Sequence, residues 1–345
     1  MADLNRREKT ILENIVYSFI QTAIPVGSRF ISKRRDIGLS PATIRNVMSD
    51  LEYLGYIGHP HTSAGRIPTD KGYRFYVNEL MNLERLDEKD KNTITSQLSG
   101  NIETDEILKV ASKILGTISN QLGVVSAPSI TTGIFEKLEL LHISSTRLLV
   151  IISVRTGVVR TIMMEIHSEI PRSKLEQLSR LLNEKLSGLS LKEIRESFSA
   201  RVNDLKNEET GLVRMFIDSV DKLFSEDKKD KIHIGGTKNI LVQPEFEDAK
   251  NFKTVIELVD NQDIIIHVLE NNESASKETN VTIGEENKID DLRDFSVVST
   301  NYTVGDMTGS IGIVGPKRMN YSKMIPLVDF VARTISSMFD PIDNK

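Results

Sequence analysis

Hydrophobic side chains recur with a helical period at the start of the chain. Residues 4–23 place their apolar side chains on one face, which predicts a helix that ends before Pro25 and Gly27. A second, shorter helix is predicted over residues 28–34, with Ser28 as its N-cap and Gly38 closing it. The turn that follows this helix can therefore span only a few residues.

The next segment has the strongest indications of a helix in the chain. Ser40 is a suitable N-cap, Pro41 occupies the first helical position, and Gly55 stands where a helix would end. Its apolar residues share an inward face: Ile44, Val47, Met48, Leu51 and Leu54. Two helices joined by a tight turn after a leading helix form a helix-turn-helix.

A strand, a polar loop and a second strand are predicted next. Residues 56–57 and 67–68 have the apolar pattern of short strands, and residues 59–66 form the polar loop between them. This order is typical of a wing. Thr69 and Asp70 can cap a final helix, so we predict a winged helix-turn-helix domain over residues 1–81.

The remaining sequence predicts an α+β fold. Residues 82–104 are poor in apolar side chains and are interpreted as a linker, after which an amphipathic helix begins near residue 105. Strands are predicted over 135–143, 147–155 and 158–166, followed by two helices, the second of which starts with a capping box of Ser190 and Glu193. Strands return at 295–299 and 310–315, before a last helix over 321–338.

Residues 201–280 differ in character because they are rich in charge, and every residue of the run 225–231 is polar. We therefore predict a multidomain α+β protein with a linker over 82–104. One α+β domain covers 105–200 plus 281–341, and an inserted subdomain covers 201–280.

Charge is distributed unevenly along the chain. The 345 residues carry 44 Lys and Arg against 49 Asp and Glu, a formal charge of −5. Residues 1–80 hold 11 basic and 8 acidic residues, or +3, whereas the rest hold 33 and 41, or −8. A basic segment joined to an acidic one is typical of a nucleic-acid-binding end. Cysteine is absent and no apolar run approaches the ~20 residues of a membrane helix, so we expect a cytoplasmic protein without membrane contact.

The outward face of the helix at 41–54 carries side chains suited to reading DNA. Major-groove readout uses polar side chains near a helix N-terminus, and Arg suits guanine as Asn suits adenine. We predict base contacts from Thr43, Arg45, Asn46 and Ser49. Phosphate contacts are predicted from hydroxyl, imidazole and basic groups nearby: Ser40, Lys33, Arg34, His61, Arg66, Lys71 and Arg74.

Patterns typical of catalysis are missing. The six His residues lack the spacing of metal ligands, and no G-x-S-x-G elbow occurs. Glycines at 309, 312 and 315 precede Lys317 and Arg318, which would allow a phosphate loop, but a buried strand leading into a helix is the better interpretation. We therefore expect neither enzyme activity nor a cofactor nor a metal.

Several motifs resemble one known family. SPATIRN at residues 40–46, LEYLGY at 51–56 and PHTSAGRIPTDKGYR at 60–74 are similar to the recognition helix, wing and following helix of the HrcA-type heat-inducible transcription repressors. QPEF at 243–246 and GSIGIVGP at 309–316 match the same family, so the resemblance spans nearly the whole chain. Val47 departs from the family pattern, at a position that we predict to face inward.

The resemblance implies a winged helix, a GAF-like domain and an inserted dimerisation domain. It also implies a homodimer that binds an inverted-repeat operator in double-stranded DNA and represses chaperone operons, with its activity maintained by a GroEL-type chaperonin. The symmetry of the implied dimer is consistent with that of the implied operator, because an inverted repeat is matched by a two-fold dimer with two recognition helices. The alternatives are a winged-helix regulator controlled by a small metabolite in its GAF-like domain, and an enzyme with a DNA-binding appendage.

Overall fold

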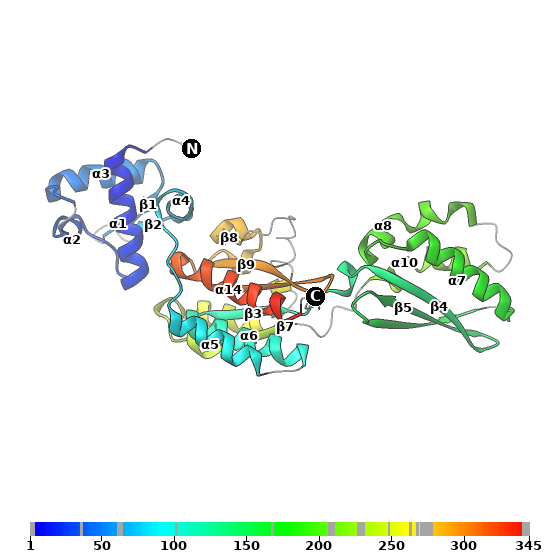
Figure 1. The fold of residues 1–345 in the computed structure, drawn as a ribbon. Coiled ribbons are helices and arrows are strands. Elements are labelled where there is room, and N and C mark those ends of the chain that lie inside the picture. Colours follow the sequence, from blue (N-terminus) through cyan, green and yellow to red (C-terminus); the bar gives the residue numbers. More distant parts are fainter. Residues whose placement is uncertain are drawn as a thin grey trace. The chain divides into compact units, whose positions relative to one another are not determined.

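The computed structural model describes residues 4–34, 37–60, 65–100, 103–166, 169–205, 211–225, 232–247, 249–261, 264–266, 269 and 279–339. The chain is an α+β protein that divides into two compact units. Figure 1 labels their main elements. The first unit comprises Met1–Ser126, Ile232–Asn301 and Ser310–Thr334, and the second comprises Ala127–Lys231, Tyr302–Gly309 and Ile335–Lys345.

The first unit begins with a small helical part, residues 4–81, which we call the head. Its elements are α1 (Arg6–Thr22), α2 (Ser28–Ser32), α3 (Pro41–Tyr53), β1 (Ile57–Gly58), β2 (Ile67–Pro68), α4 (Asp70–Phe75) and the π-helical turn η1 (Tyr76–Leu80). Asn5 starts α1 with a capping box that includes Glu8, because its side chain accepts hydrogen bonds from the amides of the first turn. The inward faces of α1 and α3 then form one core, as the apolar spacing predicted: Ile11, Leu12, Ile15, Ile44, Met48 and Leu51.

One prediction for the head differs in detail. Ser28 is the first residue of α2 rather than its N-cap, and Gly27 precedes the helix without a side-chain cap. The short antiparallel pair β1–β2 follows α3, with Ile57 opposite Pro68. An isolated bridge between Val26 and Arg66 ties this pair to the segment before α2.

The rest of the first unit, which we call the body, is built on a five-stranded sheet. Its strands are β3 (Leu122–Ser126), β7 (Ile232–Gly235), β8 (Asn280–Ile283), β9 (Phe295–Val304) and β10 (Met307–Pro316), in the order β7-β3-β10-β9-β8. β3 lies antiparallel to β10, with Val125 opposite Ile311, and antiparallel to β7, with Val124 opposite Ile234. Strands distant in sequence are therefore neighbours at the centre of the sheet.

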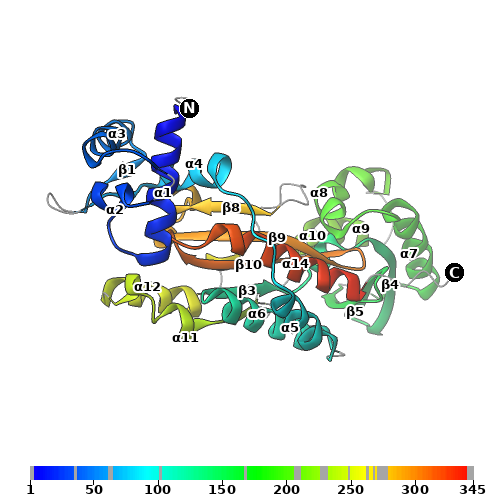
Figure 2. The same ribbon diagram turned by 60° about the vertical axis from the view of Figure 1, so that its left-hand side comes forward.

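Helices pack on both faces of this sheet. On one face, α6 (Thr104–Ser119) approaches β3 and β7 so closely that only glycine fits at the contact, at positions 116, 123 and 235. On the other face, Leu122 and Val124 of β3 join an apolar cluster with α11 (Thr237–Ile240), η4 (Pro244–Phe246) and α12 (Ala249–Asp260). Figure 2 labels α11 and α12. The body is completed by η5 (Gly284–Asn287), η6 (Asp290–Leu292) and the start of α14 (Tyr321–Phe339).

The predicted linker at 82–104 contains a helix, α5 (Glu88–Ser99). Asp87 caps it by accepting from the amide of Asp90, and the helix buries Ile94 and Leu98. Two apolar residues four positions apart are enough to bury one face of a helix against its surroundings, although the composition of the segment is polar. Low apolar content was therefore a poor criterion for a linker here.

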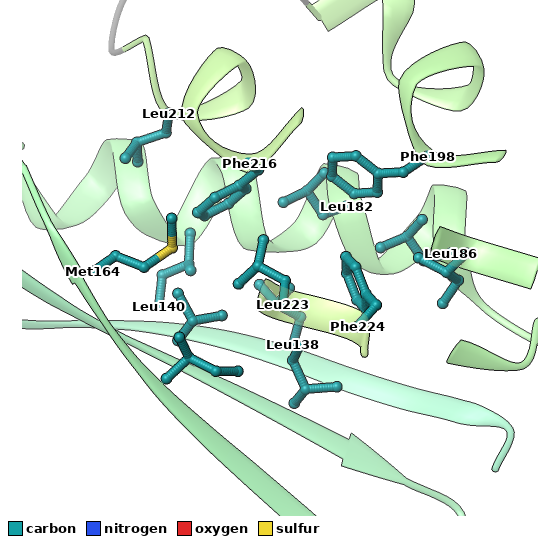
Figure 3. Close-up of a cluster of buried hydrophobic side chains, with 14 of the residues drawn as sticks. Leu138, Leu140, Met164, Leu182, Leu186, Phe198, Leu212, Phe216, Leu223 and Phe224 are labelled. Atoms are coloured by element: carbon teal, nitrogen blue, oxygen red, sulfur yellow. The ribbon is translucent and has the colours of Figure 1, made fainter. Parts of the chain in front are cut away.

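Among its described residues, the stretch Ala127–Lys231 of the second unit combines a three-stranded meander with four α-helices. Strands β4 (Phe135–Ser144), β5 (Arg147–Val154) and β6 (Val159–Glu165) run antiparallel in that order. Helices α7 (Arg172–Leu186), α8 (Leu191–Arg201), α9 (Leu212–Asp218) and α10 (Val220–Phe224) bury one face of this sheet, with short turns η2 (Ile130–Thr132) and η3 (Asn203–Leu205) beside them. Figure 3 shows their leucines and phenylalanines directed toward Leu138 and Leu140 of β4.

The opposite face of this meander is open. Leu141, Leu149 and Met163 lie side by side across β4, β5 and β6, and Leu141 and Met163 are each 45% exposed. Ile143 and Val159, also on the outer strands, are more than half exposed.

The division into units differs from the predicted one. The sequence predicts one α+β domain that includes the strands at 135–166 and an insertion over residues 201–280, whereas in the structure Ala127–Lys231 form the second unit and Ile232–Asn301 belong to the first. Alternating hydrophobicity predicts that a strand has one buried face but does not say which sheet it joins. The polar run at 225–231 marks the end of the second unit rather than the middle of an insertion.

We expect Gly123→Ala to destabilise the body by about 1–3 kcal/mol, since overpacking has costs of this size. An added Cβ would lie 2.3 Å from the carbonyl oxygen of Ser112 and 2.6 Å from Cβ of Leu115, so β3 and α6 would have to separate. Urea unfolding followed by circular dichroism measures the change. Gly100→Ala is the matched control because its Cβ would meet open space, and equal midpoints for the two variants would contradict the close packing.

Candidate nucleic-acid interface

The N-terminus of α3 is fixed by its own hydroxyl groups. Oγ of Ser40 accepts a hydrogen bond from the amide of Thr43 at 3.1 Å and lies 3.0 Å from Oγ1 of Thr43. Ser40 is the N-cap and Pro41 the first helical residue, which confirms the predicted start of this helix. The cap holds the first turn, where contacts with base edges are made in helix-turn-helix proteins, in a defined geometry.

The outward face of α3 presents the predicted base-reading side chains. Arg45, Asn46 and Ser49 are exposed and Thr43 is half-buried, whereas Ile44, Met48 and Leu51 are buried. Val47, where the sequence departs from the family pattern, is half-buried at the edge of the inward face. The helix therefore packs on one side and leaves a polar side that includes Arg45 accessible.

Tyr53 extends this face and was not singled out from the sequence. It ends α3 with 92% of its surface exposed, which is unusual for an aromatic side chain. It follows Ser49 by four residues and Arg45 by eight, so the three lie on the same face of the helix. The spacing of four residues between Ser49 and Tyr53 is enough to place Tyr53 on this face from the sequence alone.

Arg66, predicted to bind phosphate, is held at the base of the β1–β2 pair. Its Nε and Nη2 donate to Oε2 of Glu52 at 2.8 and 2.7 Å, and Nδ1 of His59 lies 2.5 Å from Oε1 of the same carboxylate. Partial burial raises the pKa of Glu52, but the hydrogen bond with His59 and the charge of Arg66 outweigh it, so this pKa lies below its usual 4.5. Glu52 thus links the C-terminal turn of α3 to both strands of the pair.

The basic residues after α2 have different surroundings. Lys33 is exposed at the end of α2. Arg34 turns back onto α1, where its Nη1 donates to Oδ1 of Asn14 at 2.5 Å and its guanidinium lies 5.4 Å from the centre of the Tyr17 ring. His61, another predicted phosphate contact, lies outside the described residues.

The two predicted phosphate contacts on α4 are engaged within the chain. Nζ of Lys71 donates to the carbonyl oxygen of Leu54, the C-terminal cap of α3, at 2.7 Å and lies 4.3 Å from the Tyr56 ring centre. Arg74 donates through Nε to Oε1 of Glu286 in the body at 2.8 Å. The structure therefore places Arg74 against the body, a partner that no local sequence pattern indicates.

Among the described residues, none of the clusters of His, Asp or Glu has the three members that could hold a metal ion. Within the same part of the chain, no helix combines the length and apolarity needed to cross a membrane.

Comparison with known proteins identifies the family. The family model of the HrcA protein C-terminal domain matches residues 105–325. The chain is 39% identical to the heat-inducible transcription repressor HrcA of Chlorobium phaeobacteroides (strain BS1), with 97% of this chain and 98% of that protein covered. It is 41% identical to the repressor of the same name from Chlorobaculum parvum, with 97% of each chain covered. The chain belongs to the HrcA family. Because HrcA proteins are named as transcription repressors, the predictions of a stress-response repressor and of a chain that is not an enzyme are confirmed.

A solved structure has a similar fold. The crystal structure of a hypothetical protein at 2.2 Å resolution superposes with a TM-score of 0.58 at 24% identity, covering 98% of this HrcA family member and 99% of that chain. This likeness concerns the fold alone.

We expect Glu52→Gln to loosen the contact between α3 and the β1–β2 pair. Because the pKa of Glu52 is depressed in the folded chain, the stabilisation by its carboxylate is complete above pH 4.5 and is lost as the pH falls below that value. Hydrogen exchange of peptides covering residues 52–68 should be about fivefold faster in the variant at neutral pH, the ratio that about 1 kcal/mol represents.

The difference between variant and wild type should vanish well below pH 4.5. Glu79→Gln is the matched control, since Glu79 is exposed on the same head. Equal exchange rates in wild type and Glu52→Gln at neutral pH would contradict the anchoring role of this carboxylate.

Proposed function

We propose that this HrcA family member is a cytoplasmic repressor of heat-shock chaperone operons, which binds an inverted-repeat operator as a homodimer. In this proposal the head is a winged helix-turn-helix, with α3 as the recognition helix and β1–β2 as the wing. The observation that carries the proposal is the exposed face of α3 with Arg45, Asn46 and Ser49, on a helix whose other face is buried in the head. The family to which the chain belongs supports it.

Each side chain of this face has a role suited to its chemistry. Arg45 would contact guanine through two hydrogen bonds, Asn46 would contact adenine, and Thr43 and Ser49 would contact either base or the sugar edge. Ser40 and Lys33 would bind phosphates and set the depth of α3 in the groove. Tyr53, at the far end of the helix, would donate a hydrogen bond from its hydroxyl group to a phosphate of the DNA backbone.

The low positive charge of residues 1–80 makes base contacts more important for the DNA affinity of this protein. Residues 1–80 carry a formal charge of only +3. Arg34, Arg66, Lys71 and Arg74 each have a partner within the chain, which reduces their availability for phosphates. Because non-specific affinity depends on the number of phosphates neutralised, a single head should bind DNA weakly. Two heads on one dimer, each reading bases, would then supply the operator affinity.

The open face of the β4–β5–β6 meander supports a dimer interface in the second unit. A row formed by Leu141, Leu149 and Met163 crosses all three strands, and exposed apolar rows of this kind mark interaction sites. A two-fold axis through such a row brings the same apolar patch of both subunits together, as isologous interfaces require. We therefore assign dimerisation to Ala127–Lys231, in place of residues 201–280.

Two further parts of the proposal rest on the family resemblance. The sheet of the body, with helices on both faces, would be the GAF-like domain. A GroEL-type chaperonin would maintain the active fold. A mobility shift with DNA from the promoter of the organism's own chaperonin operon, with and without chaperonin, tests both the repressor function and the chaperonin requirement.

We expect Arg45→Ala to weaken operator binding by about 1–3 kcal/mol and to reduce discrimination at one base pair, because a bidentate Arg–guanine contact contributes that much. Fluorescence anisotropy against the operator and against single-base variants measures both effects.

Arg172→Ala is the matched control, since it removes the same charge from an exposed side chain on α7 in the second unit. Equal losses of specific and non-specific binding in Arg45→Ala would refute the base-reading role.

We expect Met163→Glu to raise the dimer dissociation constant by about 30-fold, because a charge at the centre of an apolar interface costs about 2 kcal/mol or more. Sedimentation velocity over a concentration series measures this constant. Gln177→Glu is the control, since Gln177 is exposed on α7, which packs against the opposite face of the meander. A dimer as stable as wild type in Met163→Glu would exclude this face as the interface.

A further inference from the structure

Two cations directly after β10 contact the head. Nζ of Lys317 lies 2.8 Å from Oδ1 of Asp70, the first residue of α4. Nη1 of Arg318 donates to the carbonyl oxygen of Ile20, in the last turn of α1, at 3.1 Å. A cation at this end of a helix is favoured by the helix dipole. The basic pair that the sequence suggested as part of a phosphate loop therefore has its partners in the head.

Arg318 is itself held in place by the body. Its Nη2 donates to Oε2 of Glu245 at 3.0 Å, and its Nε donates to Oε1 of the same carboxylate. The side chain is only 15% exposed. This two-point contact fixes the plane of the guanidinium, so that the remaining nitrogen is directed at α1.

A second group of contacts joins α4 to the turn after β8. Nη2 of Arg74 donates to the carbonyl oxygen of Val281 at 2.6 Å and to Oε2 of Glu286, and Nε reaches Oε1 of Glu286 at 2.8 Å. In the other direction, the amide of Glu285 donates to Oδ2 of Asp70 at 3.2 Å. The head and the body thus each supply both a hydrogen-bond donor and an acceptor.

Gly284 shows that this turn is shaped around the head. Its φ of +58° is a conformation that glycine adopts readily. A Cβ at this position would lie 1.9 Å from Oδ2 of Asp70, so the carboxylate occupies the space that any other side chain would fill. Apolar packing completes the contact, because Tyr73 and Tyr321 are both buried with ring centres 6.2 Å apart.

The contact leaves the DNA-reading face free. Arg45, Asn46, Ser49 and Tyr53 are exposed while α1 and α4 are docked on the body. Docking therefore does not block α3, and it fixes the orientation in which α3 is presented.

We propose that Asp70, Arg74, Glu286, Lys317 and Arg318 form a joint that fixes the head on the body and so determines which spacing of operator half-sites the dimer accepts. The proposal rests on the proposed function, since spacing matters only for a dimer with two DNA-reading heads. Half-sites repeat with the helical turn of DNA, about 10–10.5 base pairs, so a rigid joint must reject a half-turn change that a loose joint tolerates. Arg74 is accordingly a positioning residue rather than a phosphate contact, and Asp70 is a positioning residue beside it.

The first measurement concerns the joint itself. The chain contains no cysteine, so spin labels attach only at introduced sites such as Gln21→Cys in the head and Asp294→Cys in the body. Pulsed electron resonance, with labelled protein diluted in unlabelled protein, should give one narrow distance distribution. Lys317→Glu should broaden it, and adding Asp70→Lys to Lys317→Glu should narrow it again.

Lys109→Glu is the matched control, because it reverses the same charge on α6, where Lys109 pairs with Glu106 of the same helix. If charge reversal disturbs folding, Asp70→Asn removes the charge at nearly constant shape. An unchanged narrow distribution in Lys317→Glu and in Asp70→Asn would overturn the joint.

The second measurement concerns spacing. The probes are a duplex selected from random DNA by the wild-type protein, the same duplex with about half a helical turn inserted between half-sites, and a single half-site. The wild-type protein should bind the duplex with the insertion about tenfold or more weakly than the selected duplex. For Lys317→Glu this loss of affinity should be much smaller, and both proteins should bind the single half-site with equal affinity.

A broadened distance distribution with unchanged dependence on spacing would overturn the spacing role. Failure of the wild-type protein to select any duplex would overturn the proposed function and with it the spacing role. The distance measurement would still decide whether the joint exists.

Discussion

Pairing between β3 and β10 is the constraint on which the first unit depends. It places Val125 opposite Ile311, 186 residues later in the chain, at the centre of the five-stranded sheet. Part of the intervening chain, Ala127–Lys231, leaves the sheet and forms a unit with an apolar core of its own. The entropic cost of closing a loop grows only slowly with its length, so such an excursion is tolerated. The same pairing directs the end of β10, with Lys317 and Arg318, to the head.

The head uses its basic residues chiefly for its own architecture. Glu52 contacts both Arg66 and His59 beside the β1–β2 pair, Lys71 contacts the last turn of α3, and Arg74 contacts the body. Isolated surface ion pairs contribute little, but pairs that share a carboxylate or span two parts of a fold act together. In the proposed function, the residues left on the surface of α3 distinguish one DNA sequence from another, while the surrounding charges determine how α3 is held.

Short-range patterns in the sequence predicted the local structure well. The caps at Ser40 and Ser190 are visible because each involves residues within three positions, and both helices start where the pattern indicated. β3 escaped notice because Leu122 continues the apolar period of α6, whereas Asn120, with a φ of 56°, ends the helix in a left-handed conformation. The exposed face of α3 followed from the helical period alone, and its extension to Tyr53 was within reach of the same argument.

Long-range partners were beyond such reasoning. Glu52 lies 14 residues from Arg66, and Glu286 lies 212 residues from Arg74. No periodicity or composition relates such positions, so an arginine that belongs to the joint looks identical to one that binds phosphate. For the same reason, the predicted boundaries differ from those of the two units. The alternating apolar pattern of the strands at 135–166 fits any half-buried sheet and does not show which sheet they join.

The separation of Arg74 from Glu286 also sets an order of events during synthesis. All strands and helices of the head are present once residue 80 has been added, but the acceptor turn and the basic pair lie near residues 284–318. At about 5–20 residues per second, a ribosome needs roughly 10–40 s to bridge that interval. Docking of the head is therefore among the last steps of folding, and a nascent chain carries α3 for that time without the contacts that hold the head on the body.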